Sequence, residues 1–100
     1  MVVFSVLYPA TDGATFDKAY YDATHIPLVK DAFQGGGLTG VRVLYALPGA
    51  PGPYVAMADL EFESMEALQA CLGGPRSAEV MADVANFTTI QPITQISAPA

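Results

Sequence analysis

Two neighbouring segments alternate as β-strands but carry mostly apolar or small side chains on both faces. They cover residues 41–47 and 54–62, and a loop rich in Pro and Gly over residues 48–53 separates them. A sheet that is covered by helices on one face leaves its other face open, so apolar residues there need a second cover. We expect that cover to be the same face of a second copy of the chain, giving a homodimer. The composition agrees, since 52% of the residues are hydrophobic and only 14% are charged.

Local patterns predict where the other strands and helices lie. Strands are expected over residues 2–8, 41–47, 54–62 and 88–96, and helices over residues 15–26, 27–34, 64–72 and 77–86. The resulting β-α-β-β-α-β order is typical of an α+β, ferredoxin-like fold with a four-stranded antiparallel sheet. We therefore predict one domain over residues 1–100. Two copies with their open faces together would make a dimeric α/β barrel.

Capping residues and prolines set the expected ends of these elements. Thr15, Ser64 and Ser77 are candidate N-caps. Pro27 is expected to end or kink the first helix and to push Ile26 out of the α region, because proline lacks an N–H and crowds the preceding residue. A proline at position 92 places the last strand at a sheet edge or a bulge.

The charge balance excludes several classes of partner. Four Lys and Arg residues against ten Asp and Glu residues give a net charge of −6, so the basic surface that nucleic acids or anionic membranes require is missing. No apolar run approaches the ~20 residues of a membrane span, and the first residues lack the basic start of a signal peptide, so we expect a cytoplasmic protein. The single cysteine cannot form an internal disulfide. With one histidine as well, too few metal ligands are present for a structural metal site, so we expect none.

His25 is the leading candidate for acid–base chemistry, because an imidazole ordinarily titrates near neutral pH. On a helix, Tyr21 four residues earlier and Asp22 three residues earlier can reach the ring. A carboxylate on one ring nitrogen fixes the tautomer and makes the other nitrogen more basic. The structural alternative is that His25 bonds a free backbone carbonyl at the helix break.

Four further residues are candidates for binding a substrate. Tyr20 belongs to an apolar stripe at helical spacing, formed by Phe16, Ala19, Tyr20 and Ala23, and is expected in the core. Tyr21 lies off that stripe, with its hydroxyl expected toward a cleft. Arg42 interrupts an apolar strand, so it either pairs with an acidic residue of the next strand, Asp59 or Glu61, or holds an acidic or phenolic ligand. Tyr45 and Met57 are the last two candidates, and their residue types fit pocket lining and simple core packing equally well.

Residues 16–29, with the sequence FDKAYYDATHIPLV, resemble the signature of the EthD family, in which an aromatic-Asp-x-x-Tyr-Tyr segment leads into His-x-Pro-Leu. The resemblance implies the dimeric α/β-barrel superfamily, which also holds small cofactor-free monooxygenases, muconolactone isomerases and larger haem enzymes. EthD-like proteins are linked to ethyl tert-butyl ether degradation, and fungal relatives to aromatic polyketide processing.

These observations lead to two functional hypotheses. The first is an enzyme without a cofactor that performs proton transfer or oxygenation on a hydrophobic aromatic, polyketide-like or ether-degradation metabolite, with His25 as general acid or base and Tyr21 and Asp22 assisting. The second is a non-catalytic protein that binds a hydrophobic ligand or supports an oxygenase system. A haem protein is disfavoured, because His25 is the only imidazole ligand available.

Overall fold

A four-stranded antiparallel sheet is the base of the computed structural model, which describes residues 1–50 and 52–100. The strand order across the sheet is β2-β3-β1-β4, with every neighbouring pair antiparallel, and it confirms the predicted ferredoxin-like fold. The predicted loop over residues 48–53 contains Pro51, which lies outside the described residues. The strands are β1 (Val2–Pro9), β2 (Leu38–Tyr45), β3 (Tyr54–Phe62) and β4 (Ile93–Ser97).

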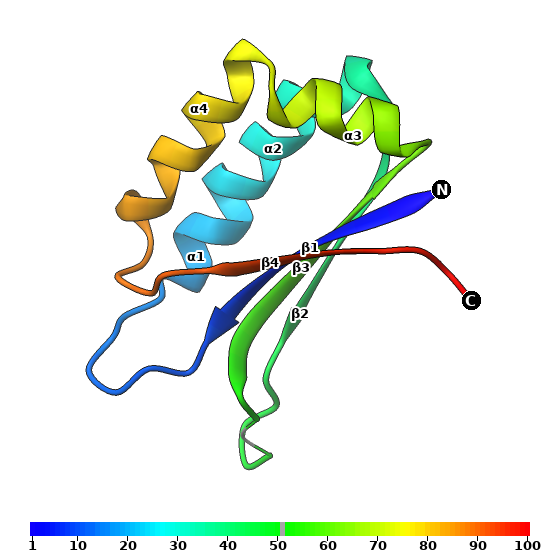
Figure 1. Cartoon of the computed structure of the whole chain (residues 1–100). Helices are drawn as coiled ribbons and strands as arrows, with labels where there is room; N and C mark the ends of the chain where they lie inside the picture. The colour runs from blue at the N-terminus through cyan, green and yellow to red at the C-terminus, as the bar shows by residue number, and fades with distance from the viewer. Residues whose placement is uncertain (51) are drawn as a thin grey trace.

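The helices lie together over one face of this sheet (Figure 1). Three segments run on without a break from residue 18 to residue 33, and a π-helical turn forms the middle one. α4, in the helical stretch that follows β3, lies beside α2. The helical segments are α1 (Lys18–Tyr20), η1 (Tyr21–His25), α2 (Ile26–Phe33), η2 (Gln34–Gly36), α3 (Met65–Leu72), α4 (Pro75–Asp83) and η3 (Val84–Asn86).

The expected break at Pro27 is wrong in one respect. Ile26 keeps helical angles, with φ −64° and ψ −43°, and its N–H bonds the carbonyl of Tyr21 five residues earlier. This wider turn lets the helix continue through Pro27, which lies in the first turn of α2 and has no N–H to donate to the preceding turn. Burial of Ile26 in the core stabilises this conformation.

Two expected N-caps are also wrong. Asp17, and not Thr15, caps α1 by accepting a bond from the N–H of Tyr20 at 3.0 Å. α4 begins directly at Pro75, so Ser77 lies inside the helix and is buried. The Ser64 cap of α3 is confirmed, with its hydroxyl 3.1 Å from the N–H of Ala67. The last strand is an edge strand, as the proline at position 92 predicts, but it begins only after that proline.

The two faces of the sheet differ in what covers them. Tyr8, Leu60 and Phe62 point toward the helices and are buried there. None of the described residues covers the opposite face, so Leu44 remains 40% exposed. Strand register aligns an apolar row across all four strands of this open face, made of Leu44, Met57, Leu7 and Ile93. Within the described part of the chain, no helix has the length and apolar character to cross a membrane.

The packing of α3 on the sheet predicts the effect of a core deletion. Leu68 is fully buried (0% exposed), so Leu68→Ala should lower the free energy of unfolding by about 2–5 kcal/mol, because it removes buried methyl groups and leaves a cavity. Met65 begins the same helix and is 38% exposed, so Met65→Ala should cost about 0.5 kcal/mol. Urea unfolding followed by circular dichroism measures both, and equal losses would contradict this packing.

Candidate functional site

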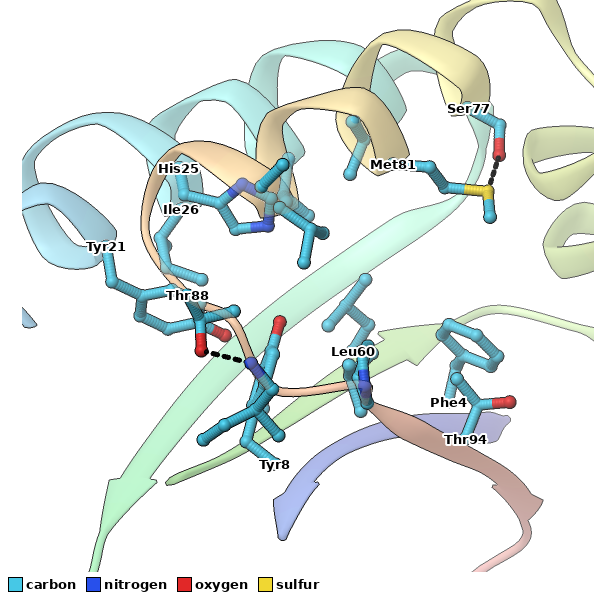
Figure 2. Close-up of a pocket in the computed structure, with 18 of the residues that line it drawn as sticks. Phe4, Tyr8, Tyr21, His25, Ile26, Leu60, Ser77, Met81, Thr88 and Thr94 are labelled. Atoms are coloured by element: carbon cyan, nitrogen blue, oxygen red, sulfur yellow. Dashed lines mark hydrogen bonds between the residues drawn. The ribbon is translucent and has the colours of Figure 1, made fainter. Parts of the chain in front are cut away.

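A cavity of about 460 Å³ lies between the sheet and the helices (Figure 2). Its floor comes from β1 and β3 and includes Phe4, Tyr8 and Leu60. η1, α2 and α4 form its roof, where His25 and Ile26 point inward. Most of the remaining lining is aliphatic, so the cavity suits a hydrophobic ligand that is oriented by a few polar groups.

His25 is the last residue of η1 and is held by a carboxylate from a distant part of the chain. Its Nδ1 lies 2.9 Å from Oδ2 of Asp83, the last residue of α4. Only 4% of His25 is exposed. The imidazole thus bonds Asp83, so the alternative of a bond to a free backbone carbonyl does not describe this structure.

Asp83 is itself fixed by two further donors. Its Oδ1 accepts hydrogen bonds from the Tyr20 hydroxyl at 2.7 Å and from Nδ2 of Asn86 at 3.0 Å. Burial acts to raise the pKa of Asp83, but the bonds from Tyr20, Asn86 and His25 outweigh it and hold this pKa below its ordinary value. Asp83 is therefore ionised at neutral pH.

An ionised Asp83 determines the tautomer of His25. A carboxylate only accepts hydrogen bonds, so Nδ1 must carry a proton. We therefore assign the neutral ring as the Nδ1–H tautomer, with a free lone pair on Nε2. Because the His25 ring lines the cavity, Nε2 is the nitrogen available to take a proton from a ligand.

Aromatic rings enclose the imidazole. His25 stacks on Tyr21, with ring centroids 5.3 Å apart and an interplanar angle of 24°, and its centroid lies 4.6 Å from that of Phe87. Phe87 also contacts Tyr8 and Tyr20. These rings keep water from the bond between His25 and Asp83, which strengthens its electrostatic part.

The structure reverses the expected burial of the two adjacent tyrosines, but Tyr21 lines the cavity as expected. Tyr21 is in the core and also lines the cavity, whereas Tyr20 is half-buried and bonds Asp83 from outside the cavity. The apolar stripe that suggested the reverse included Ala19 and Ala23, and both are exposed here. Alanine is small enough to be tolerated on either face of a helix, so these two positions were poor indicators of the buried side.

Asp22 does not hold His25. Its Oδ1 accepts a hydrogen bond from the Tyr45 hydroxyl at 2.6 Å, and the Lys18 ammonium lies 5.0 Å from the centre of the Tyr45 ring. Burial and the bond to Asp22 raise the pKa of Tyr45 above its ordinary value. Asp22 and Tyr45 thus form a separate polar cluster outside the lining of the cavity.

Arg42 and Met57 lie on the open face of the sheet. The Arg42 side chain is 69% exposed, and its Nη2 is 3.4 Å from Oδ2 of Asp59. This contact matches the predicted pairing with the neighbouring strand. Met57 belongs to the apolar row, so neither residue lines the cavity that contains His25.

Sequence reasoning missed two residues of the site, Asp83 and Tyr8. Asp83 carries a signal, because a negative charge in the last turn of a helix opposes the helix dipole and therefore needs a compensating partner. Tyr8 places a hydroxyl on the core-facing side of β1, where a buried polar group also needs a partner. Neither signal identifies the partner.

The bonds to Asp83 predict a pH-dependent contribution of Tyr20 to stability. A carboxylate whose pKa is lowered by folding stabilises the protein fully above its unfolded pKa, about 3.9, and loses that contribution as the pH falls through the folded pKa. Tyr20→Phe removes one donor, so it should lower the free energy of unfolding at pH 7, and lower it by less below pH 3, where more of Asp83 is protonated. Urea unfolding at both pH values checks this, and an equal loss at both would contradict it.

Comparison with known proteins agrees with the fold and the sequence signature. The EthD domain family matches residues 9–91, and no curated protein matches the chain. An EthD-like protein from Ralstonia eutropha JMP134 is 38% identical over 96% of this chain and 88% of its own, with a TM-score of 0.86. An EthD family protein from Bacillus halodurans C-125 is 21% identical over 100% and 99%, with a TM-score of 0.77. SnoaB, a cofactor-independent oxygenase from Streptomyces nogalater, is 9% identical over 99% and 92%, with a TM-score of 0.71. The chain therefore belongs to the EthD family.

Proposed function

We propose that this protein is a cofactor-independent enzyme that transfers a proton on a hydrophobic metabolite bound in the cavity, with His25 as general acid and base. The observation that carries the proposal is the buried imidazole whose Nδ1 is bonded to Asp83 and whose ring lines the cavity. A base that is anchored on one nitrogen and open to the ligand on the other has the arrangement that proton transfer requires.

Asp83 acts as the positioning residue in this proposal. It keeps the proton on Nδ1 before the reaction, and its negative charge stabilises the imidazolium that forms when Nε2 takes a proton from the ligand. Asp83 thus holds the His25 ring, which is the role that was expected of Asp22. Tyr21 remains a candidate, because its ring stacks on His25 and it also lines the cavity.

Cofactor independence is proposed from two observations. The polar groups that line the cavity include an acid–base group, and proton transfer needs no electron carrier. SnoaB, a structure with the same fold, is described as a cofactor-independent oxygenase. At 9% identity the likeness concerns the fold alone. It supports the statement that this fold can hold a reaction without a cofactor, and it says nothing of the reaction of this chain.

Ligand binding without turnover is the second candidate, and the mostly aliphatic lining of the cavity favours it. An accessory role beside an oxygenase needs only that binding. The two candidates differ in whether His25 changes the rate of a reaction or only the affinity for a ligand.

We also propose that the chain forms a homodimer through the open face of the sheet. The apolar row on that face stays in contact with water in a single chain, and Leu44 and Ile93 at its two ends are exposed. Pairing this face with itself about a two-fold axis would bury the row. A relative of this fold from Thermobifida fusca YX, 14% identical, is described as a dimeric ferredoxin-like protein.

Substitution of His25 separates the enzyme from the binding protein. A panel of phenols and β-diketones is screened by NMR titration of the His25 ring, the only imidazole in the chain. For a diketone that binds, His25→Gln should slow deuterium exchange at its acidic C–H by about 10²–10⁴-fold, because the positioned base is lost. Asp83→Asn should slow exchange while leaving the dissociation constant unchanged. Binding with an exchange rate that His25→Gln does not alter would support the binding protein instead.

The dimer is tested by sedimentation of the protein and of Met57→Glu, which places a charge in the middle of the apolar row. At micromolar concentration the unaltered chain should sediment at twice the mass of one 10.5 kDa chain, and the variant as a single chain. Leu68 is away from this face, so Leu68→Ala is a control that should remain dimeric while folded. A single-chain mass for the unaltered protein would overturn the proposal.

A further inference from the structure

Two buried tyrosine hydroxyls meet inside the cavity. Tyr8 rises from β1 in the floor and Tyr21 descends from η1 in the roof, and both are only 1% exposed. Figure 2 shows the two hydroxyls pointing toward one another beneath the His25 ring. The two rings pack edge to face, with centroids 5.8 Å apart.

The pair of hydroxyls has one O–H donor that the bond between the two tyrosines does not use. A phenol offers one O–H, and when one of the two donates to the other, the pair still holds one unused O–H. Both side chains line the cavity, so the unused donor is available to a ligand. Burial raises the pKa of Tyr8 to about 12 and also raises that of Tyr21, which keeps both phenols protonated near neutral pH.

The charge of the cavity selects against anionic ligands. Among the described residues that line it, no Lys or Arg is present, and the ionised Asp83 lies behind His25. A carboxylate or phosphate ligand would lose its hydration without gaining a cation. The arrangement therefore suits a neutral, apolar ligand that develops negative charge on one oxygen only during the reaction.

We propose that the hydroxyls of Tyr8 and Tyr21 bind the oxygen of a carbonyl compound that carries an acidic C–H next to the carbonyl. The proposal rests on the acid–base function of His25 proposed above and adds the substrate class. Nε2 of His25 takes the proton, the C–H bond electrons form a C=C bond, and the carbonyl π electrons move to the oxygen. The phenol donor stabilises the resulting enolate oxygen. Return of the proton to the oxygen gives the enol, and where a C=C bond is conjugated with the enolate, its return to the far carbon of that bond shifts the double bond; neither isomerisation needs an oxidant.

The test uses 2-naphthol, whose ionised oxygen resembles an enolate oxygen on an apolar body. Its absorption spectrum, followed against pH with and without protein, gives the ratio of the affinities for naphtholate and for naphthol. Tyr8→Phe and Tyr21→Phe should each lower this ratio about tenfold, because a hydrogen bond to a charged oxygen is lost. Tyr54 is the first residue of β3 and does not line the cavity, so Tyr54→Phe is the matched control and should leave the ratio unchanged. Circular dichroism verifies that each variant is folded, and either of the two cavity variants suffices for the test.

The outcomes separate this inference from the acid–base function. An unchanged ratio in a folded Tyr8→Phe or Tyr21→Phe protein, or no binding of naphthol, would overturn the role of the phenol pair. If His25→Gln abolishes deuterium exchange while the ratio stays unchanged in the tyrosine variants, only the phenol pair is refuted. If the ratio falls in those variants while His25→Gln leaves exchange intact, the oxygen-binding pair stands and the acid–base function falls.

Discussion

The hydrogen bond between His25 and Asp83 joins η1 and α4, two of the helical segments that form the roof of the cavity. The two residues are 58 positions apart in the chain, and each is the last residue of its helical segment. Asp83 ends α4, where its charge opposes the helix dipole, so donors from Tyr20, Asn86 and His25 must compensate it. One carboxylate therefore sets both the tautomer of His25 and the relative position of the two segments.

The fold explains why a cavity forms at this place. The helices cover a single face of the sheet, and the space between the two layers is filled by aromatic rings at one end and left open beside α4. Phe87 lies within the aromatic end, in contact with Tyr21 and His25. Rings on several sides fix the imidazole, while the aliphatic part of the lining leaves room for a ligand.

Much of the fold is predictable from the sequence, because the signals involved are local. The limits of β3 follow from strand alternation over residues 54–62, and the Ser64 cap marks the start of α3. The continuation of the helix through Pro27 is not predictable in this way. A π-helical turn lets the helix pass through the proline, and this turn is stabilised by burial of the residues on it, including Tyr21 and His25.

The sequence by itself determined the order of strands and helices, the family signature and the choice of His25 as the one imidazole. Only the tertiary structure decided that Asp83 and not Asp22 holds that imidazole, and that Tyr21 is buried in the core while Tyr20 bonds Asp83 from outside the cavity. The physical reason is that helical spacing describes neighbours along one helix, whereas the partner of His25 comes from another helix. The extra residue in the π-helical turn also shifts which side chains face inward, and no local pattern records that shift.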